Sequence, residues 1–355
     1  MGGALHRLSA GRGAVTTADA DGTSVVVDAP LVGIDDVRAA ADVLRGIAMR
    51  TPLVSFGQPD VRHLLKAESL QPIGAFKIRG AYNAIASLSA EERARGIVTH
   101  SSGNHAQGVA RAARLLGARA VIVMPDDAPP VKVDRVRADG AEIVFVGPAA
   151  SERLAMADRL VEEYGYTLVP PYDDDRVIAG QGTCGLEIAE DVPDLASVLV
   201  PIGGGGLASG VAVAVRALHP TARIIGVEPE LAADAQASLR QDRIVSITAD
   251  EAGRTMADGV RAQAIGRRTF AHLRVLLDDI VTVSEAEIAA AVRLAAEEAR
   301  LVVEPTGAVS IAALRYRLRE AGVADAEGTV VAVVSGGNVD PERYRALLAS
   351  PLPGG

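Results

Sequence analysis

Lysine is scarce in this chain, so chemistry that needs a lysine amine has few candidates. The 355 residues contain three lysines, Lys66, Lys77 and Lys132. Lys77 follows Phe76 in QPIGAFKIRGAYNAI, directly after a Pro-Ile-Gly turn and at the start of a helical pattern. A solvated surface lysine would also fit this position. Burial would instead lower the pKa of the amine and suit it to Schiff-base formation with an aldehyde cofactor.

A run of four glycines, residues 203–206, lies in SVLVPIGGGGLASGVAVAVRAL between an apolar strand and a helix. Exposed backbone N–H groups and the helix dipole at such a turn attract an anion, so we expect a phosphate there. The segment also fits G-x-G-x-x-A through Gly203, Gly205 and Ala208, with Glu228 ending the next strand, as in dinucleotide-binding folds. A tight turn without a ligand is the third interpretation.

A third polar segment, THSSGNHAQGVARAARLLG at residues 99–117, follows an apolar strand and opens a helix. Small polar residues at a helix start cap the first-turn N–H groups, and the same arrangement can bind a carboxylate. Both interpretations stay open for Ser101, Ser102 and Asn104. His105 equally fits a structural or a functional role.

The elements that must position these residues alternate between short apolar runs and helical periodicity, which indicates βα units and a largely parallel sheet. Strands are predicted at 63–67, 96–100, 119–125, 141–146, 197–202, 223–228 and 329–335. Amphipathic helices are predicted at 108–117, 151–165, 210–218 and 286–300.

The length of the chain predicts two lobes around a cleft. No Pro/Gly/Ser linker divides the sequence, so we expect one lobe to be inserted in the other. The predicted division is a disordered tail at 1–30, a large domain at 31–95 and 174–345, a small domain at 96–173 and a C-terminal tail at 346–355.

Composition narrows the functional classes. A net charge of -9 without Lys/Arg clusters argues against a nucleic-acid partner. Cys184 is the only cysteine, which excludes an intrachain disulfide and fits a cytoplasmic protein. The first thirty residues lack the apolar stretch of a signal peptide, and no apolar run approaches the ~18–20 residues that span a bilayer. We therefore expect an enzyme that acts on small molecules.

Together these segments resemble the fold-type II pyridoxal-phosphate enzymes, in the branch of threonine/serine dehydratases and serine racemases. The matching strings, from about residue 32 to 345, are KAESLQPIGAFKIRGA, SSGNHAQGVA, VIAGQGT, PIGGGGLASG, GVEPELAAD, TMADGV, EPTGA and SGGNVD. The resemblance implies an α/β fold of two open, mostly parallel twisted sheets flanked by helices, with the small lobe inserted in the large lobe.

The resemblance also implies roles around the cofactor, pyridoxal 5'-phosphate. Lys77 would hold the cofactor as a Schiff base and move protons at the substrate Cα, and Phe76 would flank the ring. Asn104 would hydrogen-bond the 3-hydroxyl, and Ser335 would face the pyridine nitrogen. The phosphate would bind the backbone amides of Gly203, Gly204, Gly205 and Gly206.

The same resemblance assigns residues to the substrate and to a metal. Ser101, Ser102 and His105 would bind the substrate carboxylate. Ser102 would face the cofactor opposite Lys77, where a hydroxyl could return a proton from the other side, so racemisation stays open. The hard oxygen donors of a Mg²⁺ or other divalent-cation site would come from Glu228, Ala232 and Asp234, although two surface acids beside a helix start would look the same.

The function predicted is a dehydratase, or ammonia-lyase, that converts L-threonine, L-serine or a related β-hydroxy amino acid to a 2-oxo acid and ammonia. Arg153 aligns with a position from which relatives reach a second substrate carboxylate, and Pro170 stands where they often have histidine, so a hydroxyaspartate-type substrate stays possible. An amino-acid racemase, an NAD-dependent oxidoreductase and a ligand sensor are the alternatives. The resemblance implies a homodimer.

Overall fold

The computed structural model describes residues 15–18, 24–27, 30–57, 62–101, 103–128, 130–147 and 149–353. Its strands are β1 (Val15–Ala18), β2 (Ser24–Val27), β3 (Leu53–Ser55), β4 (His63–Ala67), β5 (Ile97–His100), β6 (Ala120–Pro125), β7 (Glu142–Val146), β8 (Thr167–Leu168), β9 (Leu195–Pro201), β10 (Arg223–Pro229), β11 (Asp279–Val283) and β12 (Thr329–Val334).

The α-helices are α1 (Ile34–Val43), α2 (Lys77–Ala86), α3 (Ala90–Arg95), α4 (Asn104–Leu115), α5 (Pro130–Ala138), α6 (Ala150–Tyr164), α7 (Asp175–Asp191), α8 (Gly206–Leu218), α9 (Asp234–Gln241), α10 (Ala249–Gly253), α11 (Arg267–Leu276), α12 (Glu285–Ala299), α13 (Pro305–Tyr316) and α14 (Pro341–Leu348). Two short 3₁₀ helices, η1 (Glu68–Leu70) and η2 (Asp258–Val260), lie between them.

The larger sheet has six strands in the order β11-β10-β9-β12-β4-β3, and only the edge strand β3 runs antiparallel to its neighbour. Successive residues of its strands point to opposite faces. In β12, Val330, Ala332 and Val334 pack with α12 and α13, whereas Val331 and Val333 pack with α7, α8 and α11. Helices therefore cover both faces, as the apolar strands require.

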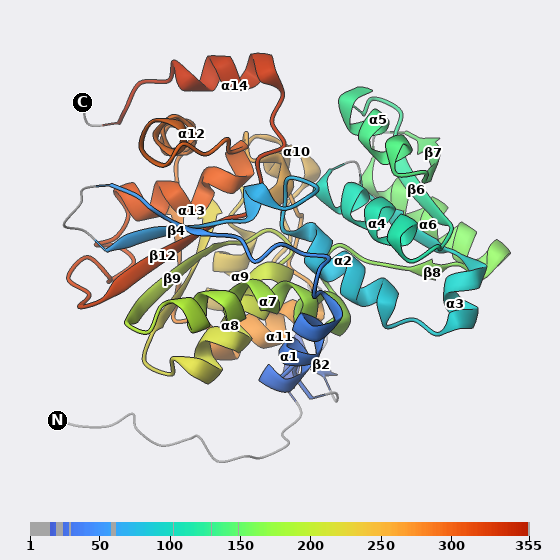
Figure 1. The fold of residues 1–355 in the computed structure, drawn as a ribbon, viewed down its shortest axis with the longest axis horizontal. Helices are drawn as coiled ribbons and strands as arrows, with labels where there is room; N and C mark the ends of the chain where they lie inside the picture. Colours follow the sequence, from blue (N-terminus) through green and yellow to red (C-terminus); the bar gives the residue numbers. More distant parts are fainter. Residues whose placement is uncertain are drawn as a thin grey trace.

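The smaller sheet has four parallel strands in the order β7-β6-β5-β8 and lies beside the larger one (Figure 1). Helix α6 packs on one face, and α2, α4 and α5 contribute to the core on the other. The two mostly parallel sheets flanked by helices confirm the predicted α/β fold.

The helix that begins with Lys77 lies between the two sheets. Ile78, Ala81 and Ile85 of α2 belong to the small-sheet core, although α2 precedes residue 96 in sequence. Helix α2 also lies against α7 of the larger lobe. The predicted boundary at residue 96 thus separates the strands of the two sheets. It does not separate their cores, because α2 belongs to the core of the smaller sheet. The exact domain limits stay a prediction.

The N-terminal segment differs in part from the predicted disordered tail. Strands β1 and β2 pair antiparallel, with Val15 opposite Val27, which the Thr, Asp, Ala and Gly composition of this segment did not indicate. Residues 1–14, 19–23 and 28–29 lie outside the described part of the chain. Among the helices that the structure does describe, we find none long and apolar enough to cross a membrane.

Candidate active site

Lys77 lies at the junction of a turn and a helix, beside the end of the central strand β12. Ala75 forms an isolated antiparallel bridge with Gly336, and the Phe76 N–H donates to the Ser335 carbonyl at 3.1 Å. Lys77 then begins α2 directly after Phe76. The chain that carries Lys77 is therefore fixed to the loop that carries Ser335, as expected if both serve one site.

The Lys77 amine is largely buried and has no carboxylate among its described hydrogen-bond partners. Its Nζ donates to the Pro171 carbonyl at 2.7 Å and lies 5.1 Å from the centre of the Phe76 ring. Burial lowers the pKa of the amine to about 8, because removal from water disfavours the charged form. The unprotonated form, which is a nucleophile and a base, is therefore more abundant near neutral pH than for an ordinary lysine.

Asn104 begins α4 and is clamped by two side chains of the larger lobe. Its Nδ2 donates to Glu304 Oε1 at 2.6 Å, and its Oδ1 accepts from Asn338 Nδ2 at 2.8 Å. Glu304 is buried, and burial together with the nearby Asp258 carboxylate raises its pKa to about 7. The quoted motifs EPTGA and SGGNVD contain Glu304 and Asn338, but their spacing gave no sign of a contact with Asn104.

His105 is buried with its ring fixed by one backbone contact. Its Nε2 lies 3.0 Å from the Val169 carbonyl, and because a carbonyl only accepts, Nε2 carries the proton. Burial and the nearby charge of Lys77 lower the pKa of His105 to about 3, so the ring is neutral. Its Nδ1 is a buried acceptor without a described partner. A carboxylate would therefore need donors other than this imidazole.

The glycine run connects β9 to α8, and the helix begins at Gly206, earlier than the predicted 210. Gly205 has φ +93°, a conformation that glycine adopts without strain. A side chain on Gly204 would collide with the Tyr172 ring. Among the described hydrogen bonds, none uses the N–H groups of residues 203–206. This narrow turn with free donors fits the predicted phosphate site.

Two further candidates, Ser335 and Ser101, directly follow the strands β12 and β5. Ser335 is buried at the end of β12, and its Oγ lies 3.4 Å from the Thr306 carbonyl. The Ser101 hydroxyl accepts from the Gly103 N–H at 3.2 Å, just before α4. Ser102, the residue on which a racemase assignment depends, lies outside the described residues.

Arg153 is half-buried on α6, close to the end of β5. The charge of its guanidinium contributes, after burial, to lowering the pKa of His100, the residue before Ser101. Burial lowers the pKa of Arg153 itself, and Asp127 opposes this shift. A positive group therefore lies near the loop expected to bind substrate. The sequence alone fitted a solvated surface arginine at this position equally well.

The proposed cation ligands meet where β10 ends and α9 begins. Glu228 is fully buried and accepts hydrogen bonds from the N–H groups of Ala235 at 3.0 Å and Gln236 at 2.8 Å. Neither carboxyl oxygen of buried Asp234 has a partner at good hydrogen-bond geometry, although the backbone N–H groups of Asp234 and Ile265 are near enough to oppose the rise of its pKa. Burial raises the pKa of Asp234 to about 7, and burial plus Asp234 raises that of Glu228. Within the described residues, no group of three or more metal-binding side chains occurs.

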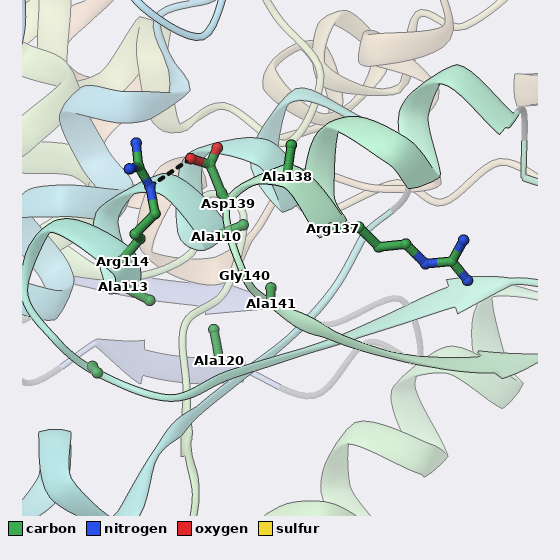
Figure 2. A pocket seen from close by; sticks show the side chains of 10 residues that line it. Ala110, Ala113, Arg114, Ala120, Arg137, Ala138, Asp139, Gly140 and Ala141 are labelled. Carbon is green, nitrogen blue, oxygen red and sulfur yellow. Dashed lines mark hydrogen bonds and ion pairs between the residues drawn. The ribbon is translucent and has the colours of Figure 1, made fainter.

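A pocket of about 300 Å³ lies elsewhere, between α4 and α5 in the smaller lobe. Figure 2 shows that it is lined mainly by alanines, with Arg114 paired to Asp139 at 2.8 Å and Arg137 pointing away. It contains none of the candidate residues above and offers few groups that could act on a substrate.

Comparison with known proteins places this site in context. Residues 45–336 match the model of the pyridoxal-phosphate dependent enzyme family. The chain is 42% identical over 322 residues to the L-threo-3-hydroxyaspartate ammonia-lyase of Pseudomonas sp, covering 88% of this chain and 97% of that protein. It is 43% identical to the L-threonine ammonia-lyase of Thermotoga maritima, covering 87% and 76%.

Among solved structures, maize serine racemase superposes with a TM-score of 0.83 at 37% identity, covering 89% of this chain and 97% of that chain. A threonine deaminase from T.th. superposes with a TM-score of 0.80 at 45% identity, covering 87% and 99%. The residues that match the family model include Lys77, Asn104 and the glycine run 203–206. This chain therefore belongs to the family of pyridoxal-phosphate-dependent enzymes.

Proposed function

We propose that this protein is an ammonia-lyase that converts L-threonine, L-serine or a related β-hydroxy amino acid to a 2-oxo acid and ammonia. The observation that carries the proposal is the buried Lys77 amine with a pKa of about 8, on a loop joined to Ser335. The ammonia-lyases among the relatives support the reaction class.

The chain's own residues can provide the proton chemistry. When bound, pyridoxal phosphate supplies an aldehyde that captures amines and a ring that draws electrons from Cα. Lys77 then accepts the Cα proton, because its unprotonated amine is available near neutral pH. Its contact with the Pro171 carbonyl orients the amine while it carries charge. The donors at the glycine turn would hold the phosphate, and Asn104, fixed by Glu304, would hold the ring hydroxyl.

The substrate carboxylate would bind at the start of α4. The Ser101 hydroxyl and the first-turn N–H groups of this helix are suitable donors. The His105 imidazole would not donate to the carboxylate, because its Nε2 proton lies on the Val169 carbonyl and its buried Nδ1 is an acceptor. This refines the role expected for His105 from the sequence: its backbone N–H, and not its ring, would contact the carboxylate.

A panel of substrates tests the reaction. We expect 2-oxo acid and ammonia from at least one of L-threonine, L-serine and L-threo-3-hydroxyaspartate, and little inversion of L-serine. The serine-racemase relatives make inversion the second candidate. Chiral chromatography that finds D-serine with little pyruvate would reverse the assignment, and absence of any 2-oxo acid would refute it.

Arg153 would select substrates with a second carboxylate. If so, R153Q lowers kcat/KM for L-threo-3-hydroxyaspartate about tenfold or more and changes that for L-serine much less, since a charged hydrogen bond contributes about 1.5–3 kcal/mol. Arg159 on the same helix is highly exposed, so R159Q is the matched control. An equal loss for both substrates would contradict a specificity role.

We also propose a divalent cation, such as Mg²⁺, at Glu228, Asp234 and the Ala232 carbonyl. The two neighbouring buried carboxyl groups of Glu228 and Asp234 support it, because hard oxygen donors suit Mg²⁺ or Ca²⁺. Millimolar Mg²⁺ should raise the unfolding temperature of the wild type by binding the folded state, and D234N should abolish the increase. An equal increase in D234N would exclude the site.

A further inference from the structure

We propose that Thr269, a residue outside all the motifs above, is a positioning residue that orients the glycine turn toward the cofactor phosphate. Thr269 lies in the first turn of α11 and is fully buried. Its Oγ1 donates to the Gly204 carbonyl at 2.7 Å; the Gly266 carbonyl is farther away, at 3.1 Å. A hydroxyl has one proton, so the Gly204 carbonyl is its principal acceptor.

This hydrogen bond determines which way the next N–H points. In a trans peptide the C=O and the following N–H point in opposite directions, and the described chain contains no cis peptide. With the Gly204 carbonyl turned toward α11, the Gly205 N–H points away from α11. Two adjacent glycines resist rotation weakly, so a fixed orientation of this peptide needs an external partner.

The other side of the same turn is held by residues that also contact Lys77 and α11. The Tyr172 ring lies against Gly204, and the preceding Pro171 carbonyl accepts from Lys77. The following residue, Asp173, accepts from the first-turn N–H groups of α11 at 2.8–3.2 Å, including that of Thr269. Thr269 is thus fixed by the segment that covers the turn, which makes it a rigid support.

The inference rests on the proposed use of the glycine turn as the phosphate site. Loss of the Thr269 hydroxyl should therefore weaken binding of pyridoxal phosphate and leave binding of pyridoxal, which lacks the phosphate, nearly unchanged. A residue that only maintains the fold would affect both ligands alike. The comparison of the two ligands separates these roles without measuring turnover.

The experiment titrates apoenzyme with each ligand by absorbance, in the wild type, T269V and T269S. We expect T269V to lower the affinity for pyridoxal phosphate about tenfold, because the Gly204 carbonyl then keeps only its longer hydrogen bond, 3.4 Å from the Gly266 N–H. The affinity for pyridoxal should fall less than about twofold. T269S keeps the donor and should stay within about threefold of the wild type. Equal losses for both ligands in T269V, or no loss, would overturn the inference.

A glycine variant separates failure of this inference from failure of the phosphate site. A Cβ at Gly205 would lie 2.8 Å from the Thr269 Cβ, at a φ that disfavours side chains, so G205A should also lose the preference for the phosphorylated ligand. If G205A keeps that preference, the phosphate assignment is wrong. If G205A loses it and T269V keeps it, only the role of Thr269 is wrong. Thermal unfolding of each apoenzyme identifies variants that do not fold.

Discussion

The Lys77 amine has a pKa of about 8 because burial disfavours its charged form. It donates a hydrogen bond to a backbone carbonyl, whereas the other two lysines form ion pairs with carboxylates. Lys66 is paired with Glu187 at 2.6 Å, and Lys132 with Asp258 at 2.9 Å. The amines of Lys66 and Lys132 are engaged by carboxylates, whereas Lys77 Nζ has no carboxylate among its described hydrogen-bond partners. Lys77 is therefore the lysine that can attack an aldehyde near neutral pH.

This difference predicts the pH dependence of cofactor uptake. The unprotonated fraction of Lys77 rises about tenfold per pH unit below its pKa and becomes constant above it. The rate at which apoenzyme gains the aldimine absorbance should therefore rise up to about pH 8 and then level off, as stopped-flow measurements can show. A rate that still rises steeply between pH 9 and 10 would indicate an ordinary surface lysine.

Lys77 and the glycine turn could be identified from the sequence because each has an unusual composition within a short window. Glu304 and Thr269 could not, since their partners Asn104 and Gly204 lie 200 and 65 residues away. Such contacts exist only once the strands are ordered in the sheets. The tautomer of His105 likewise depends on the Val169 carbonyl, which no local pattern reveals.

At the scale of elements, helix α2 is held in place by a buried ion network centred on Arg79. Arg79 donates to both oxygens of Glu68, at 2.7 and 2.8 Å, and to Glu187 at 2.7 Å. The positive charges of Lys66 and Arg79 thus neutralise the carboxylates of Glu68 and Glu187 below the surface. Arg79 is only two residues beyond Lys77. Arginine side chains are mostly exposed in proteins, so no sequence pattern indicated this cluster.

Removing the central charge should be costly. R79M removes the positive charge that neutralises the Glu68 and Glu187 carboxylates. It should lower the free energy of unfolding of the apoenzyme by about 3–5 kcal/mol, which is measured as a lower midpoint of urea unfolding. The matched control is R62A, which removes the exposed ion pair with Asp194 and should cost less than about 1 kcal/mol. Similar losses in the two variants would show that the network does not stabilise α2.

The predicted elements match the structure where the pattern is strong. The predicted strand 63–67 coincides with β4, and 329–335 exceeds β12 by one residue. Strands β3 and β8, of three and two residues, are too short to produce a recognisable alternation. Helix α8 starts before its predicted position because the last residue of the glycine run joins its first turn.

At the scale of the whole molecule, we propose that the homodimer expected from resemblance uses three exposed apolar side chains, those of Met49, Leu70 and Val302. Their exposed fractions are 47%, 43% and 53%. They lie in one region, because the Met49 N–H donates to Gln71 and residues 69 and 302 both border Gly337. Exposed apolar side chains that gather in one region are typical of interaction sites.

The dimer can be tested by light scattering after size exclusion. Wild-type enzyme should have twice the mass of the chain, and L70E/V302E should shift toward the monomer, because burial of two charges disfavours the interface. V275E changes another exposed apolar residue, on α11, and should remain dimeric. A monomeric wild type, or dissociation by V275E alone, would contradict this placement of the interface.

Covalent binding of the cofactor by Lys77 is central to the proposed function, and chemical trapping tests it most directly. Borohydride reduction of the holoenzyme fixes the cofactor on whichever lysine forms the Schiff base, and peptide mass spectrometry then locates the label. With three lysines in the chain, there are three possible sites. We predict a pyridoxyl group on Lys77 alone; a label on Lys66 or Lys132, or none on Lys77, would contradict this assignment.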